Sequence, residues 1–288
     1  MTLATDELLP WGLGYVVLDV EDLDQAARWW TVFAMLEENG RTDDTVYLRG
    51  GTAHHWIVLR KTTGKPGIGR MAFELKEPAD LDRYRALLDA EGVPFTEHDG
   101  DFTGDAIRFS DPNGYEVELF AAMGDMGVAV TKPWIKPVTM LHAVVAVADL
   151  DKSYDFYHRM LGFRESDRVI DKTIFLRGSN DYHHSLVIGA GRGEPPLLDH
   201  IAFLYDNVDD LMRVRQNYLE EGQPIARDVL RHPTSGSMGF YGAAEPAPLM
   251  VEYCIDHAKI TDPHYRPRQL PPGRWTSNVW RPPVGLNS

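Results

Sequence analysis

The sequence of this 288-residue chain repeats itself at an offset of about 130 residues. The matched stretches are 12–39 with 139–166, 53–58 with 182–187, 69–95 with 199–225, and 115–120 with 249–254. The offset grows from 127 to 134 along these matches, as small loop insertions would produce. A long internal repeat means that similar units pack together, so it constrains the fold more than any single motif.

Each half contains a smaller motif twice: an apolar run, a short turn and a segment with apolar side chains at helical spacing. We therefore expect an α+β fold of two domains, each of two βαβββ modules that form a concave mixed sheet. The expected helices lie near 24–36, 79–91, 151–161 and 208–221, and further matched strands near 42–50 and 171–179. An Asp-Leu-Asp turn precedes the first helix of each half, where an aspartate can cap free N–H groups.

The repeat also predicts where the domains begin and end. We expect an N-terminal domain over 1–127, a linker over 128–138 and a C-terminal domain over 139–257. The linker prediction depends on two Lys-Pro pairs and nearby glycines. In residues 258–288 the periodicity stops and proline is frequent, so this tail is expected to be irregular and to dock on the body of the protein.

Composition excludes several classes of protein. The net charge of −14 gives no basic face for nucleic acid. The chain has no apolar run of the roughly 18 residues that a membrane span needs, and its N-terminus lacks the pattern of a signal peptide. A single cysteine, Cys254, rules out an internal disulfide and fits a reducing compartment. We therefore expect a cytoplasmic protein with neither nucleic acid nor membrane as a partner.

Three ionisable residues lie inside apolar, strand-like runs of the second half: His142 in LHAVVAV, His200 in DHIAFLY and Glu252 in LMVEYCI. Burying such groups costs several kcal/mol unless they are paired or coordinated. Two imidazoles and one carboxylate on neighbouring strands form the facial triad that holds non-haem Fe(II). The alternative is three separate polar side chains, each with its own hydrogen bond in the core.

The repeat favours the metal-site interpretation. His142 and His200 occupy equivalent positions in the two modules of the second half, and modules related by a twofold axis would bring them together. The matching residues of the first half are Tyr15 and Arg70, so that half has lost both histidines. We expect one metal per chain, within residues 139–256.

Residues 231–252, RHPTSGSMGFYGAAEPAPLMVE, resemble the signature of the type I extradiol ring-cleavage dioxygenases, a family of the vicinal-oxygen-chelate superfamily. His232, Tyr241 and Glu252 match its histidine, its tyrosine and its glutamate ligand. Two departures are Leu230, where the signature prefers a smaller or polar residue, and a turn before Glu252 that is one residue longer. The resemblance extends over about residues 10–257.

The resemblance implies a set of roles for this chain. His142, His200 and Glu252 would be the ligands of Fe(II), with Mn(II) as an alternative that the same ligands hold. His184 matches the family's catalytic histidine and would move a proton near the oxygen site. His232 and Tyr241 match the pair that bonds to the substrate hydroxyls.

The activity that the resemblance implies is cleavage of a catechol ring beside its two hydroxyls by O2, giving a hydroxymuconic semialdehyde-type product. The substrate stays open among monocyclic, alkylated and bicyclic catechols and hydroquinones, and a homo-oligomer is expected. Two alternatives also stay open. One is a small-molecule binding protein of the same superfamily, and the other is a glyoxalase-type metal lyase or isomerase without oxygen chemistry.

Several further polar residues are expected to be structural: His54, His55, His183 and Cys254. His183 is next to His184, and in a strand it would point to the opposite face. Glu118, the counterpart of Glu252, is expected to be a relic of the duplicated site that is hydrogen-bonded or partnered by Arg70.

Overall fold

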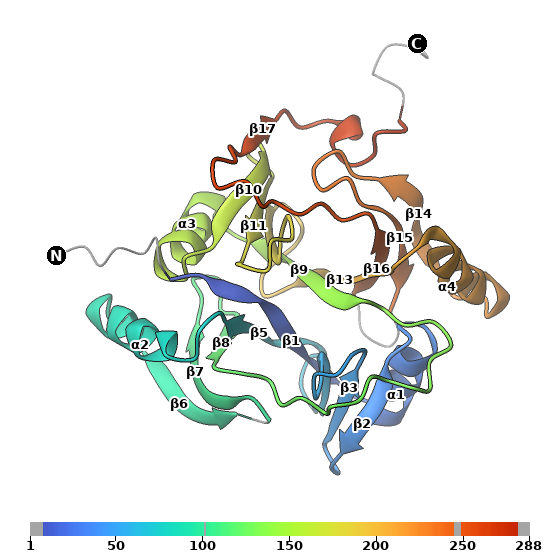
Figure 1. The fold of residues 1–288 in the computed structure, drawn as a ribbon, viewed down its shortest axis with the longest axis horizontal. Coiled ribbons are helices and arrows are strands. Elements are labelled where there is room, and N and C mark those ends of the chain that lie inside the picture. The colour runs from blue at the N-terminus through green and yellow to red at the C-terminus, as the bar shows by residue number, and fades with distance from the viewer. Residues whose placement is uncertain (1–7, 101, 245–248, 282–288) are drawn as a thin grey trace.

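A computed structural model describes residues 8–100, 102–244 and 249–281 of the chain, and Figure 1 shows its two halves. The strands form two mixed sheets, one of eight strands from the first half and one of nine strands from the second half. The expected α+β fold of βαβββ modules is therefore confirmed.

The first half contains β1 (Pro10–Val20), α1 (Leu23–Val32), β2 (Glu37–Arg41), β3 (Thr45–Arg49), β4 (Ile57–Lys61), β5 (Gly67–Leu75), α2 (Asp80–Ala90), β6 (Phe95–Gly100), β7 (Gly104–Ser110) and β8 (Glu116–Phe120). Its strands follow the order β2-β3-β4-β1-β5-β8-β7-β6. The first strands of the two modules, β1 and β5, are thus antiparallel neighbours in the middle of the sheet.

The second half contains β9 (Thr139–Val147), α3 (Leu150–Asp155), a π-helical turn (Phe156–Met160), β10 (Arg164–Val169), β11 (Thr173–Arg177), β12 (Leu186–Ala190), β13 (Leu198–Leu204), α4 (Val208–Glu220), β14 (Ile225–Arg231), β15 (Met238–Ala243), β16 (Met250–Ile255), β17 (Arg268–Leu270) and a 3-10 turn (Arg274–Thr276). The sheet order is β14-β15-β16-β13-β9-β12-β11-β10-β17. Again the first strands of the modules, β9 and β13, are antiparallel neighbours at the centre.

The helices begin where the sequence predicts. The Asp22 carboxylate accepts a hydrogen bond from the N–H of Gln25 at 2.9 Å, and Asp149 accepts one from Lys152 at 3.0 Å. These contacts confirm the aspartate caps before the first helix of each half. The predicted helix over 151–161 is divided: its last turn is a π-helix rather than an α-helix.

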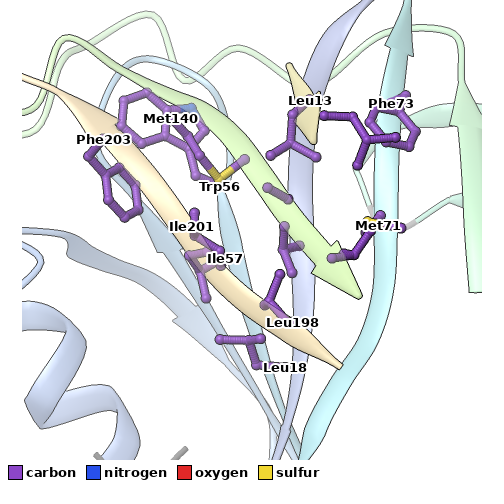
Figure 2. Close-up of a cluster of buried hydrophobic side chains, with 14 of the residues drawn as sticks. Leu13, Leu18, Trp56, Ile57, Met71, Phe73, Met140, Leu198, Ile201 and Phe203 are labelled. Carbon is purple, nitrogen blue, oxygen red and sulfur yellow. The ribbon is translucent and has the colours of Figure 1, made fainter. Parts of the chain in front are cut away.

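The two sheets pack against each other through apolar side chains that alternate along their central strands. Figure 2 shows this core, with side chains of both halves interleaved. The labelled residues are Leu13, Leu18, Trp56, Ile57, Met71, Phe73, Met140, Leu198, Ile201 and Phe203. Because side chains in a strand alternate between faces, every second side chain of these strands points away from this core, on the opposite face of its sheet.

The linker and the tail both contact the folded halves. In the linker, the backbone N–H groups of Thr131 and Lys132 each donate to Glu37 of β2 at 3.0 Å. The tail crosses the second sheet between its two outer edges (Figure 1), since β17 pairs with β10 and the N–H of Val279 donates to Arg231 of β14. None of the helices that the structure describes is long and apolar enough to cross a membrane.

Candidate metal centre

A single row of paired residues crosses four strands of the second sheet. Tyr241 on β15 pairs with Glu252 on β16, Glu252 with Ala202 on β13, and Ala202 with His142 on β9. Paired residues on neighbouring strands present their side chains on the same face. His200 lies two residues before Ala202 and therefore shares this face. The pairing of the strands thus places the three predicted ligands and the predicted tyrosine on one face of the sheet.

The three predicted ligands converge on one point. The Nε2 atoms of His142 and His200 lie 3.2 and 3.3 Å from the same oxygen, Oε2 of Glu252. One ligand atom from each residue lies within 4.8 Å of the others, and all three side chains are buried. Nitrogen and carboxylate ligands around one divalent ion need this spacing.

The charges at this point suit a divalent cation. Burial alone would raise the pKa of Glu252, but hydrogen bonds with His142 and His200 outweigh burial and hold that pKa well below its usual range. Burial lowers the pKa of His142 and of His184. The site therefore holds an ionised carboxylate beside two imidazoles, those of His142 and His184, that favour the neutral form, which is the form that binds metal.

Neighbouring groups orient one ligand ring. Nδ1 of His200 lies 2.6 Å from the Asp199 carboxylate, which therefore fixes the orientation of the ring and leaves Nε2 for the metal. Hydrogen bonds to Asp199 and Glu252 raise the pKa of His200 although burial alone would lower it. Nδ1 of His142 is buried and has no hydrogen-bond partner among the described residues.

His232 and Tyr241 lie together on the open side of the triad. Nε2 of His232 is 2.8 Å from the Tyr241 hydroxyl and 3.7 Å from Oε1 of Glu252. The guanidinium of Arg227, on β14, stacks 5.1 Å from the centre of the Tyr241 ring. Burial raises the pKa of Tyr241, with a further rise from the Glu252 charge, so its hydroxyl remains a hydrogen-bond donor.

A cavity of about 300 Å³ opens directly onto these groups. Its walls include the three triad residues, His184, the His232–Tyr241 pair and four residues of the tail, Pro272, Gly273, Thr276 and Ser277. The His184 ring stands 4.1 Å from the His142 ring, centre to centre. The structure therefore brings all six residues singled out from the sequence to one cavity. The longer turn before Glu252 includes 245–248, which lie outside the described residues.

The expectation for His183 is wrong in one respect. Its ring does not point away from His184, because the two Nδ1 atoms lie 2.9 Å apart. The pair precedes β12 instead of lying within it, so the alternation of side chains along a strand does not apply. Nε2 of His183 contacts the buried carboxylate of Asp167 at 2.9 Å.

The sequence analysis missed His257, which lies five residues after Glu252. One nitrogen from each of His142, His184 and His257 lies within 4.8 Å of the others, and all three side chains are buried. Both ring nitrogens of His257 are buried without a hydrogen-bond partner among the described residues. The signal in the sequence was a further histidine just past the strand that carries Glu252.

The first half repeats the row with other side chains. Arg108 pairs with Glu118, Glu118 with Ala72, and Ala72 with Tyr15. Tyr15 donates to Glu118 at 2.6 Å, and Nη1 of Arg70 lies 3.3 Å from the same carboxylate. The expected partnership of Glu118 with Arg70 is confirmed, and the guanidinium of Arg108 forms a second ion pair with the same carboxylate.

Comparison with known proteins places this arrangement in a family. The model of the Glyoxalase/Bleomycin resistance protein/Dioxygenase superfamily matches residues 12–119 and 139–263. The chain therefore belongs to this superfamily, and the family model matches it once in each half.

Relatives of similar length are extradiol dioxygenases. The manganese-dependent 2,3-dihydroxybiphenyl 1,2-dioxygenase of Geobacillus genomosp. 3 is 26% identical over 252 residues, 78% of this chain and 75% of the relative. The iron-dependent extradiol dioxygenase of Rhodococcus jostii (strain RHA1) is 26% identical over 285 residues, 89% of this chain and 93% of the relative. In fold, homoprotocatechuate 2,3-dioxygenase from Brevibacterium fuscum, solved with 3,4-dihydroxyphenylacetate, superposes with a TM-score of 0.85 at 20% identity, covering 99% of this chain and 92% of that chain.

Proposed function

We propose that this protein is an extradiol dioxygenase that opens the ring of a catechol beside its two hydroxyls, with O2 as co-substrate and Fe(II) or Mn(II) at the triad. The observation that carries the proposal is the row that joins Tyr241, Glu252 and His142 on one buried face beside the cavity. A structural role for each polar residue alone would not require a shared face or a shared cavity.

His142, His200 and Glu252 would hold the ion, since their donor atoms suit divalent iron or manganese and already surround one point. When bound, the ion supplies coordination for both substrate oxygens and a path for electrons from the ring to O2. Relatives that depend on manganese and on iron both resemble the chain at 26% identity. The donor set therefore supports a divalent metal of either kind.

His232 and Tyr241 would orient the substrate. Their side chains meet at 2.8 Å on the open side of the triad, so a substrate oxygen between them and the metal would receive hydrogen bonds from both. Such donors stabilise negative charge on an oxygen that has lost its proton. His184, on the cavity wall beside His142, would accept and return protons.

The decisive test separates ring cleavage from the two alternatives. Protein loaded with Fe(II), and separately with Mn(II), is mixed with catechol without oxygen and then exposed to air. We expect uptake of O2 together with a yellow ring-opened product. Binding of catechol without oxygen uptake would favour a binding protein, and turnover of an oxygen-independent substrate such as a hemithioacetal would favour a glyoxalase-type enzyme.

A further inference from the structure

We infer that Asp167 and His183 are positioning residues that hold His184 in a single tautomer, with Nε2 unprotonated toward the cavity. The inference rests on the proposed function, because it concerns a proton-transfer group of the same site. Its basis is a chain of hydrogen bonds that runs from the tail of the protein to the cavity wall.

The chain of contacts has two links of similar length. Oδ2 of Asp167 lies 2.9 Å from Nε2 of His183, and Nδ1 of His183 lies 2.9 Å from Nδ1 of His184. All three side chains are buried, so water does not compete for these contacts. Because Nδ1 of His184 faces His183, Nε2 is the nitrogen that remains for the cavity that this residue lines.

The tail keeps Asp167 in its ionised form. Oδ1 of Asp167 accepts hydrogen bonds from the backbone N–H of Arg268 at 2.8 Å, from its Nε at 3.0 Å and from the Tyr265 hydroxyl at 3.2 Å. The guanidinium of Arg268 also bonds to Oδ2. A carboxylate held by these donors accepts hydrogen bonds only, so Nε2 of His183 must carry the proton in this contact.

The tautomer of His184 follows from this direction. A neutral imidazole has one donor and one acceptor nitrogen. If Nε2 of His183 donates to Asp167, then Nδ1 of His183 is an acceptor and Nδ1 of His184 must donate to it. A doubly protonated His183 would place a buried positive charge next to the charge of Arg268, with one carboxylate for the two. Nε2 of His184 is therefore left without a proton.

The consequence is an order of proton transfers. His184 first takes a proton from a substrate hydroxyl onto Nε2, breaking that O–H bond and forming an N–H bond. Only then can it donate this proton later in the reaction. In the opposite tautomer, Nε2 would already carry its proton and could not act as the first acceptor.

The first half of the protein serves as an internal control. Its histidine pair keeps the same contact, with Nδ1 of His54 and of His55 3.0 Å apart. The position of Asp167, opposite Phe175 in its strand pair, is taken by Gly40, opposite Tyr47. The histidine pair is thus common to both halves, whereas the carboxylate belongs to the half that carries the predicted metal ligands.

A spectroscopic test reads the tautomer directly and does not depend on activity. The full chain is labelled with 15N-histidine, loaded with Zn(II) as a diamagnetic ion, and the His184 signals are assigned by their loss in His184→Gln. We expect a protonated Nδ1 and an unprotonated Nε2 in the wild type, and a mixture of tautomers in Asp167→Asn. A protonated Nε2 in the wild type overturns the inference.

A kinetic test adds a disrupting variant, a rescuing variant and a matched control. His183→Phe keeps an aromatic ring but breaks both hydrogen bonds, and we expect kcat to fall roughly 100-fold with little change in KM or metal content. His183→Gln retains one donor and one acceptor, and its kcat should stay within about 10-fold of the wild type. His54→Phe makes the same change in the half without the carboxylate and should leave kcat unchanged.

The outcomes separate the two proposals. If the wild type consumes no O2 with any catechol, the proposed function fails, while the tautomer measurement still decides the inference. If the wild type cleaves catechol and folded His183→Phe turns over equally fast, the inference fails and the proposed function stands. A His183→Phe protein that does not fold leaves the decision to the wild-type tautomer and to His183→Gln.

Discussion

At the scale of single residues, each half has a buried glutamate at the same position of its sheet, but the side chains around the two glutamates differ. Glu252 has imidazole neighbours and an adjoining cavity, whereas Glu118 is surrounded by Tyr15 and two cations, Arg70 and Arg108. A guanidinium always carries its charge and donates in a fixed direction, so it satisfies a buried carboxylate without any metal. The same strand position therefore carries a candidate metal ligand in one half and the centre of an ion-pair cluster in the other.

This contrast predicts opposite results for two equivalent substitutions. Glu252→Gln should weaken metal binding by more than about 100-fold, because it removes a ligand instead of an outer-shell partner, whose loss costs roughly 10–100-fold. Glu118→Gln should leave one metal per chain and lower the free energy of unfolding by roughly 3 kcal/mol, since it removes the buried charge that Arg108 and Arg70 share and leaves Arg70 with Glu116 alone. Elemental analysis after dialysis and urea unfolding measure the two quantities. If Glu118→Gln lost its metal while Glu252→Gln kept it, the assignment of the site to the second half would be contradicted.

At the scale of elements, the linker between the two halves is held against strand β2 by hydrogen bonds to one carboxylate. Glu37 of β2 forms a buried ion pair with Arg49 at 2.7 Å and accepts the N–H groups of Thr131 and Lys132. Burial by itself would raise the pKa of Glu37, but these backbone and guanidinium donors lower it to about 2. The contact between the linker and the first sheet therefore favours the ionised form of the Glu37 carboxylate.

The shift predicts how stability depends on pH. A folded pKa below the unfolded value of about 4.3 means that Glu37 contributes stability above that value and loses it as the pH falls toward about 2. We expect Glu37→Gln to lower the free energy of unfolding by about 2–3 kcal/mol at pH 7, with the difference vanishing near pH 2. Urea unfolding at several pH values measures it, with exposed Glu77→Gln as the control. An equal loss at pH 2 and pH 7 would show that packing and not charge is responsible.

At the scale of the whole molecule, the protein has a negative net charge, whereas the side chains that line the cavity carry more positive than negative charge. The chain carries a net charge of −14, yet the described residues that line the cavity include three cations, Lys172, Arg192 and Arg227, and a single carboxylate, Glu252. Arg192 is paired with Asp199 at 3.0 Å, so the surplus comes from the other two cations. A positive cavity in an acidic protein raises the local concentration of anions.

We therefore expect catechols with a carboxylate substituent to be preferred over neutral ones of similar size. Compared with 4-methylcatechol at low salt, 3,4-dihydroxyphenylacetate should show a lower KM, by roughly 10-fold, and the gap should narrow at high salt because ions screen exposed charges. Lys172→Met should reduce the gap, whereas Lys65→Met, an exposed change in the first half, should not. Equal KM values at low salt would contradict the expectation.

Much of the fold and of the site could be predicted from the sequence, because the repeated modules can be recognised by comparing one stretch of the chain with another. The matched runs identified the modules, and the histidines at equivalent positions identified which half would bind metal. The relation of His183 to its neighbours could not be predicted in this way. It depends on Asp167 and on Arg268, which lies about 100 residues further along in a tail without periodicity.

What the sequence by itself predicted is the module architecture, the set of candidate ligands His142, His200 and Glu252, and the motif that contains His232 and Tyr241. Alternation along strands and internal duplication encode the first two features in the order of the residues, whereas the third came from the resemblance of residues 231–252 to a family signature. The tertiary structure alone decided that His257 joins the cluster and that the tail fixes Asp167. Such contacts join irregular segments far apart in the chain, where no period relates one residue to the other, so only the docking of those segments brings them together.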